Sequence, residues 1–319
     1  MSDMPAPPPA ANLSAGQGAL VTDRPDPTVP AGGEVTAGRS TWRRVLRSFG
    51  ENKLGIAGVA IVVAVIGFCF AGPLLYHTDQ VSPNAAQINL PPSAQHPVDT
   101  DYIGFDVLGR LMAGGQSSIE IGLAVAVVAT LFGVPWGAVS GYWGGAVDNV
   151  MMRVVDVVLA IPSIFLFIYL ATVFKPTVPL LIIVVSALSW VGPARLVRGE
   201  TLSLRVREYV QAVRVMGGRP PRIVLRHIVP NTIGTIVVNA TFQVADAILI
   251  LATLSFLGFG LPPPAATWGG MLSEGTNYLY DGYWWEVYPA GIMIALTVIA
   301  FNFIGDALRD ALEVRLQRR

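Results

Sequence analysis

The chain has 319 residues, of which only 13% are Asp, Glu, Lys or Arg and 53% are hydrophobic. Soluble domains carry about 25% charged residues, and a globule with so few charges would leave large apolar areas facing water. This composition all but excludes a soluble enzyme or a nucleic-acid-binding protein and predicts an integral membrane protein. The 21 basic and 21 acidic residues give a formal net charge of zero.

The first 38 residues differ in composition from the rest of the chain. They are rich in Pro, Ala and Gly, with PAPPPAA near the start and RPDPTVP further on. Because such a segment has little apolar area to offset the entropy of ordering, we expect residues 1–38 to form a disordered tail. The segment 39–53 is basic and precedes the first apolar run, which lacks the pattern of a removable signal peptide.

Six largely apolar runs follow within residues 54–319. A transmembrane helix needs about 20 mostly apolar residues, so we predict an all-α membrane domain with six transmembrane helices. Prolines and glycines interrupt several runs, which is tolerated where neighbouring helices satisfy the backbone. The predicted spans are Leu54–Leu75, Ile121–Ser140, Val157–Phe174, 175–195, Ile233–Leu257 and Val287–Gly305, and the fifth contains one acid, Asp246.

The basic residues are sorted by side. Six spans place the segment 39–53, the second and fourth connections and the C-terminal tail together, and these hold almost all of the arginines. The opposite side has only Arg110 and Lys175, against seven acidic residues. Because cytoplasmic connections carry an excess of Lys and Arg, both termini are predicted to be cytoplasmic.

The cytoplasmic connection at about 195–232 is the longest on the basic side. Apolar residues recur there at helical spacing from Leu202 onward, with arginines on the other faces, which predicts an amphipathic helix. The apolar positions are Val206, Tyr209, Val210 and Val213.

A second short helix is predicted to follow. Gly217 and Gly218 can end the first helix, and Pro220 and Pro221 suit the first turn of the next one. Pro230 then marks the start of the fifth span. Such a helical hairpin can fit a groove of another protein. On composition alone, a solvated basic loop that only sets the topology stays an open alternative.

The stretch EYVQAVRVMGGRPPRIVLRHIVPN resembles the EAA signature of ABC importer permeases, E-A-A-x3-G-x9-I-x-L-P. The spacing, the glycine and the proline are retained, whereas Gln, Val, His and Val stand where the signature has Glu, Ala, Ile and Leu. The resemblance implies an ATPase-coupling loop. The residues that it assigns to this loop are Gln211, Ala212, Val213, Gly217, Gly218, His227 and Pro230.

Further segments resemble dipeptide and oligopeptide permeases of the DppC/OppC type. HPVDTDYIGFDVLGRLMAGG is similar to the segment that follows their first span, although Asp99 and Phe105 stand where that pattern usually has Gly and Arg. The resemblance runs in order from about residue 42 to the end. The other matching segments are GYWGGAVDNVMMRVVDVVLAIPS, residues 189–210, LSFLGFGLPPPAATWGGML and NFIGDALRDALEVR.

The resemblance implies a type I ABC importer permease in a bacterial plasma membrane. Such a subunit forms half of a channel with a second homologous permease, two cytoplasmic ATPase domains and an extracytoplasmic substrate-binding protein. The implied substrates are dipeptides or oligopeptides, with glutathione or nickel chelates as the alternative. Neither Lys53 nor Lys175 lies in a nucleotide-binding G-x4-G-K-[ST] loop, so we expect a non-catalytic subunit without a cofactor of its own. ATP and Mg would be held by the partner ATPases.

Four acidic residues have two open interpretations each. A carboxylate within a span is costly, so Asp246 either lines the translocation path or is a structural acid bonded to a neighbour such as Asn239 or Thr241. On the outer side, Asp99, Asp101 and Asp106 either contact the binding protein or serve in turns and helix capping.

Two other classes of protein are alternatives. A secondary transporter or channel would explain six spans and one intramembrane acid, but it gives no reason for the arginine-rich hairpin. An intramembrane enzyme would need at least two reactive groups at matching depth, and only Asp246 is available. His77, His96 and His227 are scattered across both sides of the membrane, so no metal site is expected.

Overall fold

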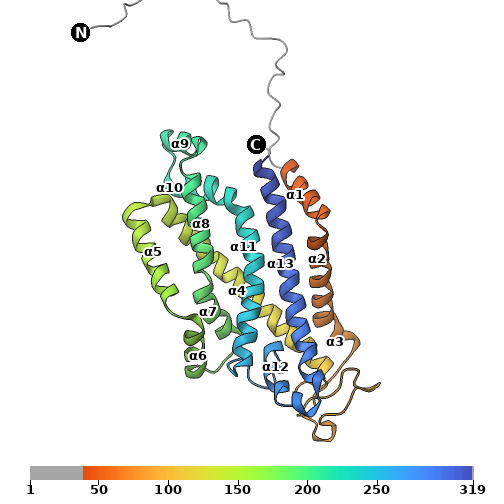
Figure 1. The fold of residues 1–319 in the computed structure, drawn as a ribbon. Helices are drawn as coiled ribbons and strands as arrows, with labels where there is room; N and C mark the ends of the chain where they lie inside the picture. The colour runs from red at the N-terminus through yellow and green to blue at the C-terminus, as the bar shows by residue number, and fades with distance from the viewer. Residues whose placement is uncertain (1–38, 318–319) are drawn as a thin grey trace, which may run out of the picture. The chain divides into compact units, whose positions relative to one another are not determined.

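The computed structural model describes residues 39–317, so the tail predicted at residues 1–38 lies outside the described residues. From Trp42 onward the chain forms one unit made of helices and loops (Figure 1). The α-helices are α1 Arg39–Glu51, α2 Lys53–Ile66, α3 Gly72–Leu75, α4 Val107–Trp143, α5 Gly145–Ala160, α6 Ser163–Val173, α7 Val178–Ser189, α8 Val191–Leu204, α9 Glu208–Val215, α10 Pro220–Ile223, α11 Val229–Phe256, α12 Trp268–Thr276 and α13 Tyr288–Gln317.

Five of the six predicted spans are confirmed as helices that are long and apolar enough to cross a membrane. Within the described residues they are Lys53–Leu75, Val107–Trp143, Val178–Leu204, Pro220–Phe256 and Trp284–Leu312. Most extend beyond the predicted bounds because each continues as an ordinary helix past its apolar window.

The third predicted span, Val157–Phe174, is wrong as a single helix. The chain instead forms α5 and α6, which meet at an angle of 74°. Ile161 and Pro162 lie at the bend in extended conformations, because proline disfavours helical geometry in the residue before it. Six spans result if this bent pair counts as one.

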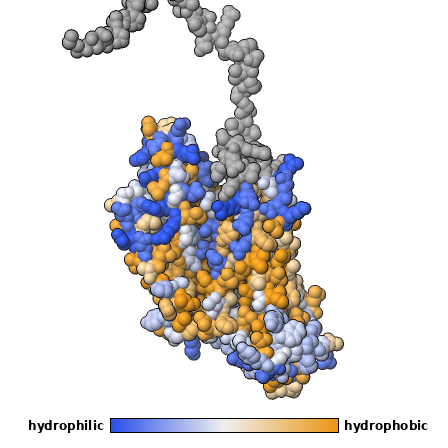
Figure 2. Space-filling view, in the orientation of Figure 1, coloured by the Kyte–Doolittle hydropathy of each residue, from blue (hydrophilic) through white to orange (hydrophobic). Residues whose placement is uncertain are grey.

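The two ends of the bundle are polar and the middle is apolar. Figure 1 shows α9, α10 and the C-terminal end of α13 at one end, and α3 and α12 at the other. In Figure 2 an apolar belt separates the two hydrophilic ends. The hairpin and the C-terminal helix end therefore lie on the same side, as the charge pattern predicted.

Helices α4 and α8 approach each other through three glycines at four-residue spacing. A methyl group at Gly133 would lie 2.5 Å from the Trp190 carbonyl oxygen, and one at Gly137 would clash with that of Ala194. At Gly141 it would lie 2.7 Å from the Thr201 side chain. Small residues at this spacing allow such backbone contact between membrane helices.

At the outer end, α12 is fixed to α4 by one aromatic side chain. Trp268 is completely buried and its indole Nε1 donates to the Leu111 carbonyl oxygen at 3.0 Å. Its ring lies over Gly115, where an added methyl group would come within 2.7 Å. The short helix therefore has one defined position against α4.

We predict that Gly137→Ala lowers the melting temperature of the purified protein, because the new methyl group pushes two backbones apart at a cost of about 1–3 kcal/mol. Gly199→Ala on α8 is the matched control, since an added methyl group there meets nothing within 4 Å. Thermal unfolding in detergent measures both. Equal melting temperatures for the two variants would contradict the close α4–α8 contact.

Candidate functional site

The predicted hairpin is present, but its first helix begins later than predicted. α8 ends at Leu204, residues 205–207 form a turn, and only then does α9 start at Glu208. The amphipathic pattern from Leu202 onward therefore covers the end of one helix and the whole of the next.

Glycine ends α9 as predicted. Gly217 has a φ of +83°, a conformation that side chains with a Cβ rarely adopt. The N–H groups of Gly217 and Gly218 donate to the carbonyl oxygens of Arg214 and Val213, at 3.1 and 2.9 Å. These bonds satisfy carbonyls that the helix end would leave unpaired.

The second half of the hairpin joins the fifth span. Two prolines open α10, as predicted, and a five-residue π-helix over Val224–Ile228 leads into α11. Pro230 lies in the first turn of α11, where a missing N–H costs nothing. Pro220–Phe256 is thus a nearly continuous helical segment that reaches into the membrane.

Buried apolar residues hold the hairpin against the bundle. Val210 and Ile223 are 2% and 0% exposed and pack in one cluster with Val134, Ala138 and Val197 of α4 and α8.

The side chain at the first position of the signature folds back on its own loop. Gln211 Nε2 donates to the Arg205 carbonyl oxygen at 3.0 Å. Ala212 is exposed, His227 is half-buried, and its carbonyl oxygen accepts from Asn231.

A clamp of charged residues, which the sequence did not predict, ties α8 to the corner between α4 and α5. Arg198 donates to both carboxylate oxygens of Asp148, at 2.6 and 2.7 Å, and Ser140 also donates to this carboxylate. Arg205 Nη1 donates to the Gly141 carbonyl oxygen at 3.0 Å, near the C-terminal end of α4. A cation at this end of a helix is favourable.

A second ion pair links the same two helices. Asp156 of α5 pairs with Arg195 of α8 at 2.6 Å. No local sequence pattern indicates this pair, because its two members lie on different helices.

The intramembrane acid lies on an exposed face of α11. Asp246 shares this face with Leu249 and Thr253. Its carboxylate makes no hydrogen bond or ion pair with any described residue, and Thr241 donates instead to the Val238 carbonyl oxygen. No hydrogen bond to Asn239 or Thr241 therefore marks Asp246 as a structural acid among the described residues. Its role in the translocation path stays a prediction.

Asp99, Asp101 and Asp106, the three acids predicted for the outer side, are buried and not exposed at the surface. Asp106 caps α4 by accepting from the Gly109 N–H, and it also accepts from the Tyr76 hydroxyl at 2.6 Å. Burial, and then the neighbouring Asp106, raise the pKa of Tyr76. Asp101 accepts from the N–H groups of Ile103 and Phe105. These two acids serve in capping and turns, so docking of a binding protein stays a prediction for the loop around them.

The chain belongs to the family described as binding-protein-dependent transport system inner membrane component, which it matches over residues 133–318. Residues 40–92 match the N-terminal TM domain of oligopeptide transport permease C. The chain is thus a multi-pass permease subunit of an ABC importer, a class that works with ATPase and substrate-binding partners.

Individual relatives cover almost the whole chain. The chain is 39% identical to the oligopeptide transport system permease protein OppC of Bacillus subtilis. The matched region covers 88% of this chain and 91% of the relative. The chain is 37% identical to the dipeptide transport system permease protein DppC of the same organism, covering 88% and 86%. A solved structure of the inward-facing MetNI methionine ABC transporter matches the fold with a TM-score of 0.52 at 19% sequence identity. The match covers 63% of this chain and 96% of the transporter chain. This last likeness shows the type I permease fold.

We predict that Arg198→Gln destabilises the purified protein by about 2 kcal/mol, because it leaves a nearly buried carboxylate without its charged partner. Arg195→Gln is the control, since both members of its pair are about half exposed and such pairs contribute less than about 1 kcal/mol. Thermal unfolding compares the two variants, and an equal loss would show that the clamp is no stronger than a surface ion pair.

Proposed function

We propose that the chain forms half of the translocation channel of a dipeptide or oligopeptide importer and is driven by ATPases through the α9–α10 hairpin. In this proposal it pairs with a second homologous permease and two ATPase domains, which hold ATP and Mg. Both termini face the cytoplasm, and a substrate-binding protein delivers peptide from outside.

The observation that carries this proposal is an apolar tip on the hairpin. Val215, Met216 and Leu225 are 86%, 77% and 70% exposed, although they lie at the polar end of the bundle. Exposed apolar patches rimmed by polar residues typically mark protein interaction sites. The rim here is basic, with Arg207, Arg214, Arg219, Arg222 and Arg226.

The peptide substrate is inferred from the relatives, which are permeases of oligopeptide and dipeptide transport systems, together with the resemblance of the motifs. Glutathione or a nickel chelate is the alternative substrate, because the partner that captures the substrate is a different chain. Reconstitution with the partner subunits distinguishes the proposal from a secondary transporter. Uptake should require ATP and stop with hydrolysis-deficient ATPases, whereas uptake driven by an ion gradient alone would contradict it.

Asp246 is proposed to line the path and to attract the amino end of a peptide. Its exposed position on α11, without a partner among the described residues, supports this role. We predict that Asp246→Asn raises the KM for peptide uptake in vesicles that contain the whole complex. Unchanged uptake by a normally assembled complex would remove Asp246 from the path.

We predict that Gly217→Val uncouples ATP hydrolysis from uptake while the spans stay inserted. The φ of +83° at this position is strained for a β-branched residue, so the end of α9 and the apolar tip beyond it must rearrange. Gly199→Val is the control, because an added side chain there has open space and an ordinary helical backbone. ATP hydrolysed per peptide transported is the measurement, and a wild-type ratio in Gly217→Val would contradict the role of the hairpin.

A further inference from the structure

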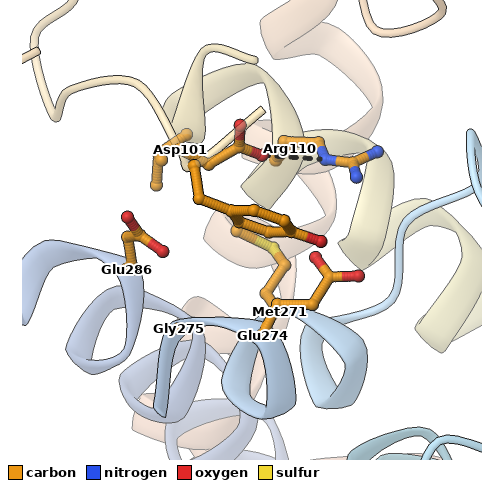
Figure 3. A pocket seen from close by; sticks show the side chains of 8 residues that line it. Asp101, Arg110, Met271, Glu274, Gly275 and Glu286 are labelled. Atoms are coloured by element: carbon orange, nitrogen blue, oxygen red, sulfur yellow. Dashed lines mark ion pairs between the residues drawn. The ribbon is translucent and has the colours of Figure 1, made fainter. Parts of the chain in front are cut away.

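Four carboxylates lie together at the outer end of the molecule, and we name them the outer acid cluster. Asp99 and Asp101 come from the loop before α4, Glu274 comes from α12, and Glu286 comes from the turn before α13. Figure 3 shows three of them around a small cavity, with Arg110 of α4 at its edge. The cluster thus joins the outer loop to the two helices beneath it.

The carboxylates of two members of the cluster, Asp101 and Glu274, have polar or charged partners. Asp101 accepts from two backbone N–H groups, and its other oxygen lies 3.7 Å from Arg110 Nε. Glu274 is bonded to the Tyr102 hydroxyl. Arg110 Nη1 also donates to the Pro264 carbonyl oxygen at 2.7 Å.

The other two members are buried without partners. Asp99 is 0% exposed, and neither of its carboxylate oxygens has a hydrogen-bond partner among residues 39–317. Glu286 is 4% exposed, and its Oε1 also has no partner in this part of the chain. Burying an ionised carboxylate in this way costs several kcal/mol or more, so such groups take up a counter-charge or become neutral.

The size of the cavity decides which ligand can supply that charge. The cavity is lined by Glu286, Asp101 and Glu274 but not by Asp99, and its volume of about 10 Å³ is the space that about one water molecule needs, so it is too small for an organic ligand. No group of three or more His, Cys, Asp or Glu side chains in the described part of the chain is arranged to hold a metal ion. We propose that Asp99 and Glu286 form a proton-binding site that holds the outer loop closed.

The charges around Asp99 agree with a bound proton. Burial, and then the negative charges of Glu286, Asp101 and Asp106, raise the pKa of Asp99 from 3.8 to about 9. The titratable and charged groups that face the site from the elements packed around it are Asp101, Tyr102 and His96 of the loop, Asp106 and Arg110 at the start of α4, Glu274 of α12, and Glu286 before α13.

The site also coincides with two departures of this sequence from the pattern that it resembles. Asp99 stands where that pattern has Gly, and its φ of +152° is one that glycine adopts more readily. Phe105 stands where the pattern has Arg, and its buried ring now lies 4.4 Å from the Arg110 guanidinium carbon. Relative to that pattern, Asp99 adds one acidic side chain and Phe105 removes one basic side chain in the same loop.

The sign of the pH dependence follows from the raised pKa of Asp99. Between about pH 4 and pH 9 the closed loop holds a proton that an open, hydrated loop releases. Raising the pH through this window therefore favours opening, by up to about tenfold per pH unit for one proton. Replacing Asp99 with Asn removes its share of this dependence and leaves that of Glu286, whose pKa is raised to about 7 by burial and then by Asp101 and Glu274.

Infrared spectroscopy of the purified complex tests the proton directly, because a protonated carboxyl group has a carbonyl stretch that a carboxylate lacks. We expect the difference between the wild type and Asp99→Asn to contain this stretch at pH 7 and to lose it as the pH approaches 10. Glu286→Gln should shift the titration. Asp79→Asn is the matched control, since this exposed carboxylate accepts from the Val81 and Ser82 N–H groups, which lower its pKa.

Hydrogen exchange over residues 88–106 provides a second measurement. Exchange corrected for intrinsic rates should quicken from pH 6 to pH 9 in the wild type and depend less steeply on pH in Asp99→Asn. If Asp99→Asn does not assemble, Asp99→Gly serves in its place. Two results would overturn the proposal: an infrared difference without a protonated carboxyl at pH 7, or loss of that stretch when Na⁺ or Ca²⁺ is added, which would indicate a cation site.

Discussion

The contact between α4 and α8 is the constraint on which the half of the molecule that carries the hairpin depends. Lipid tails are as apolar as leucine side chains, so membrane helices gain little from hydrophobic burial against each other and associate through close packing. Gly133, Gly137 and Gly141 supply that packing by letting the two backbones touch along two turns. The arrangement brings the cytoplasmic end of α8 beside the α4–α5 corner, where Arg198 can reach Asp148.

The hairpin rests on this packed pair. Val210 and Ile223 anchor it to α4 and α8, while its apolar tip faces away from the bundle. In the proposed function, a force applied to the tip by an ATPase is therefore passed to α4, α5 and α8 together. The bent helices α5 and α6 then carry the movement toward the outer side. At that outer end, the acid cluster adds a separate control that responds to pH.

Hydropathy, charge sorting and the glycine and proline spacing of the hairpin were enough to predict the span count, the placing of the hairpin and the C-terminal helix end at the same end of the bundle, and the residues at which the hairpin helices stop. The third span was misplaced because Asp148, Arg153 and Asp156 excluded the first part of α5 from a search for uncharged runs. The spacing of the three glycines was visible in the sequence, but the helix that they face was not. The burial of Asp99 depends on the packing of α12 and the turn before α13, which no local pattern contains.

The central claim is that the hairpin moves as one body with α4, α8 and the start of α5. Electron–electron distance measurements test it with spin labels on cysteines at Met216 in the tip and Val150 in α5, both exposed positions. The native Cys69 is buried and does not compete for the label. We predict that this distance is the same in nucleotide-free and ATP-bound complexes that are competent for transport. A distance that changes or broadens on ATP binding would show that the hairpin bends independently, and would contradict the account.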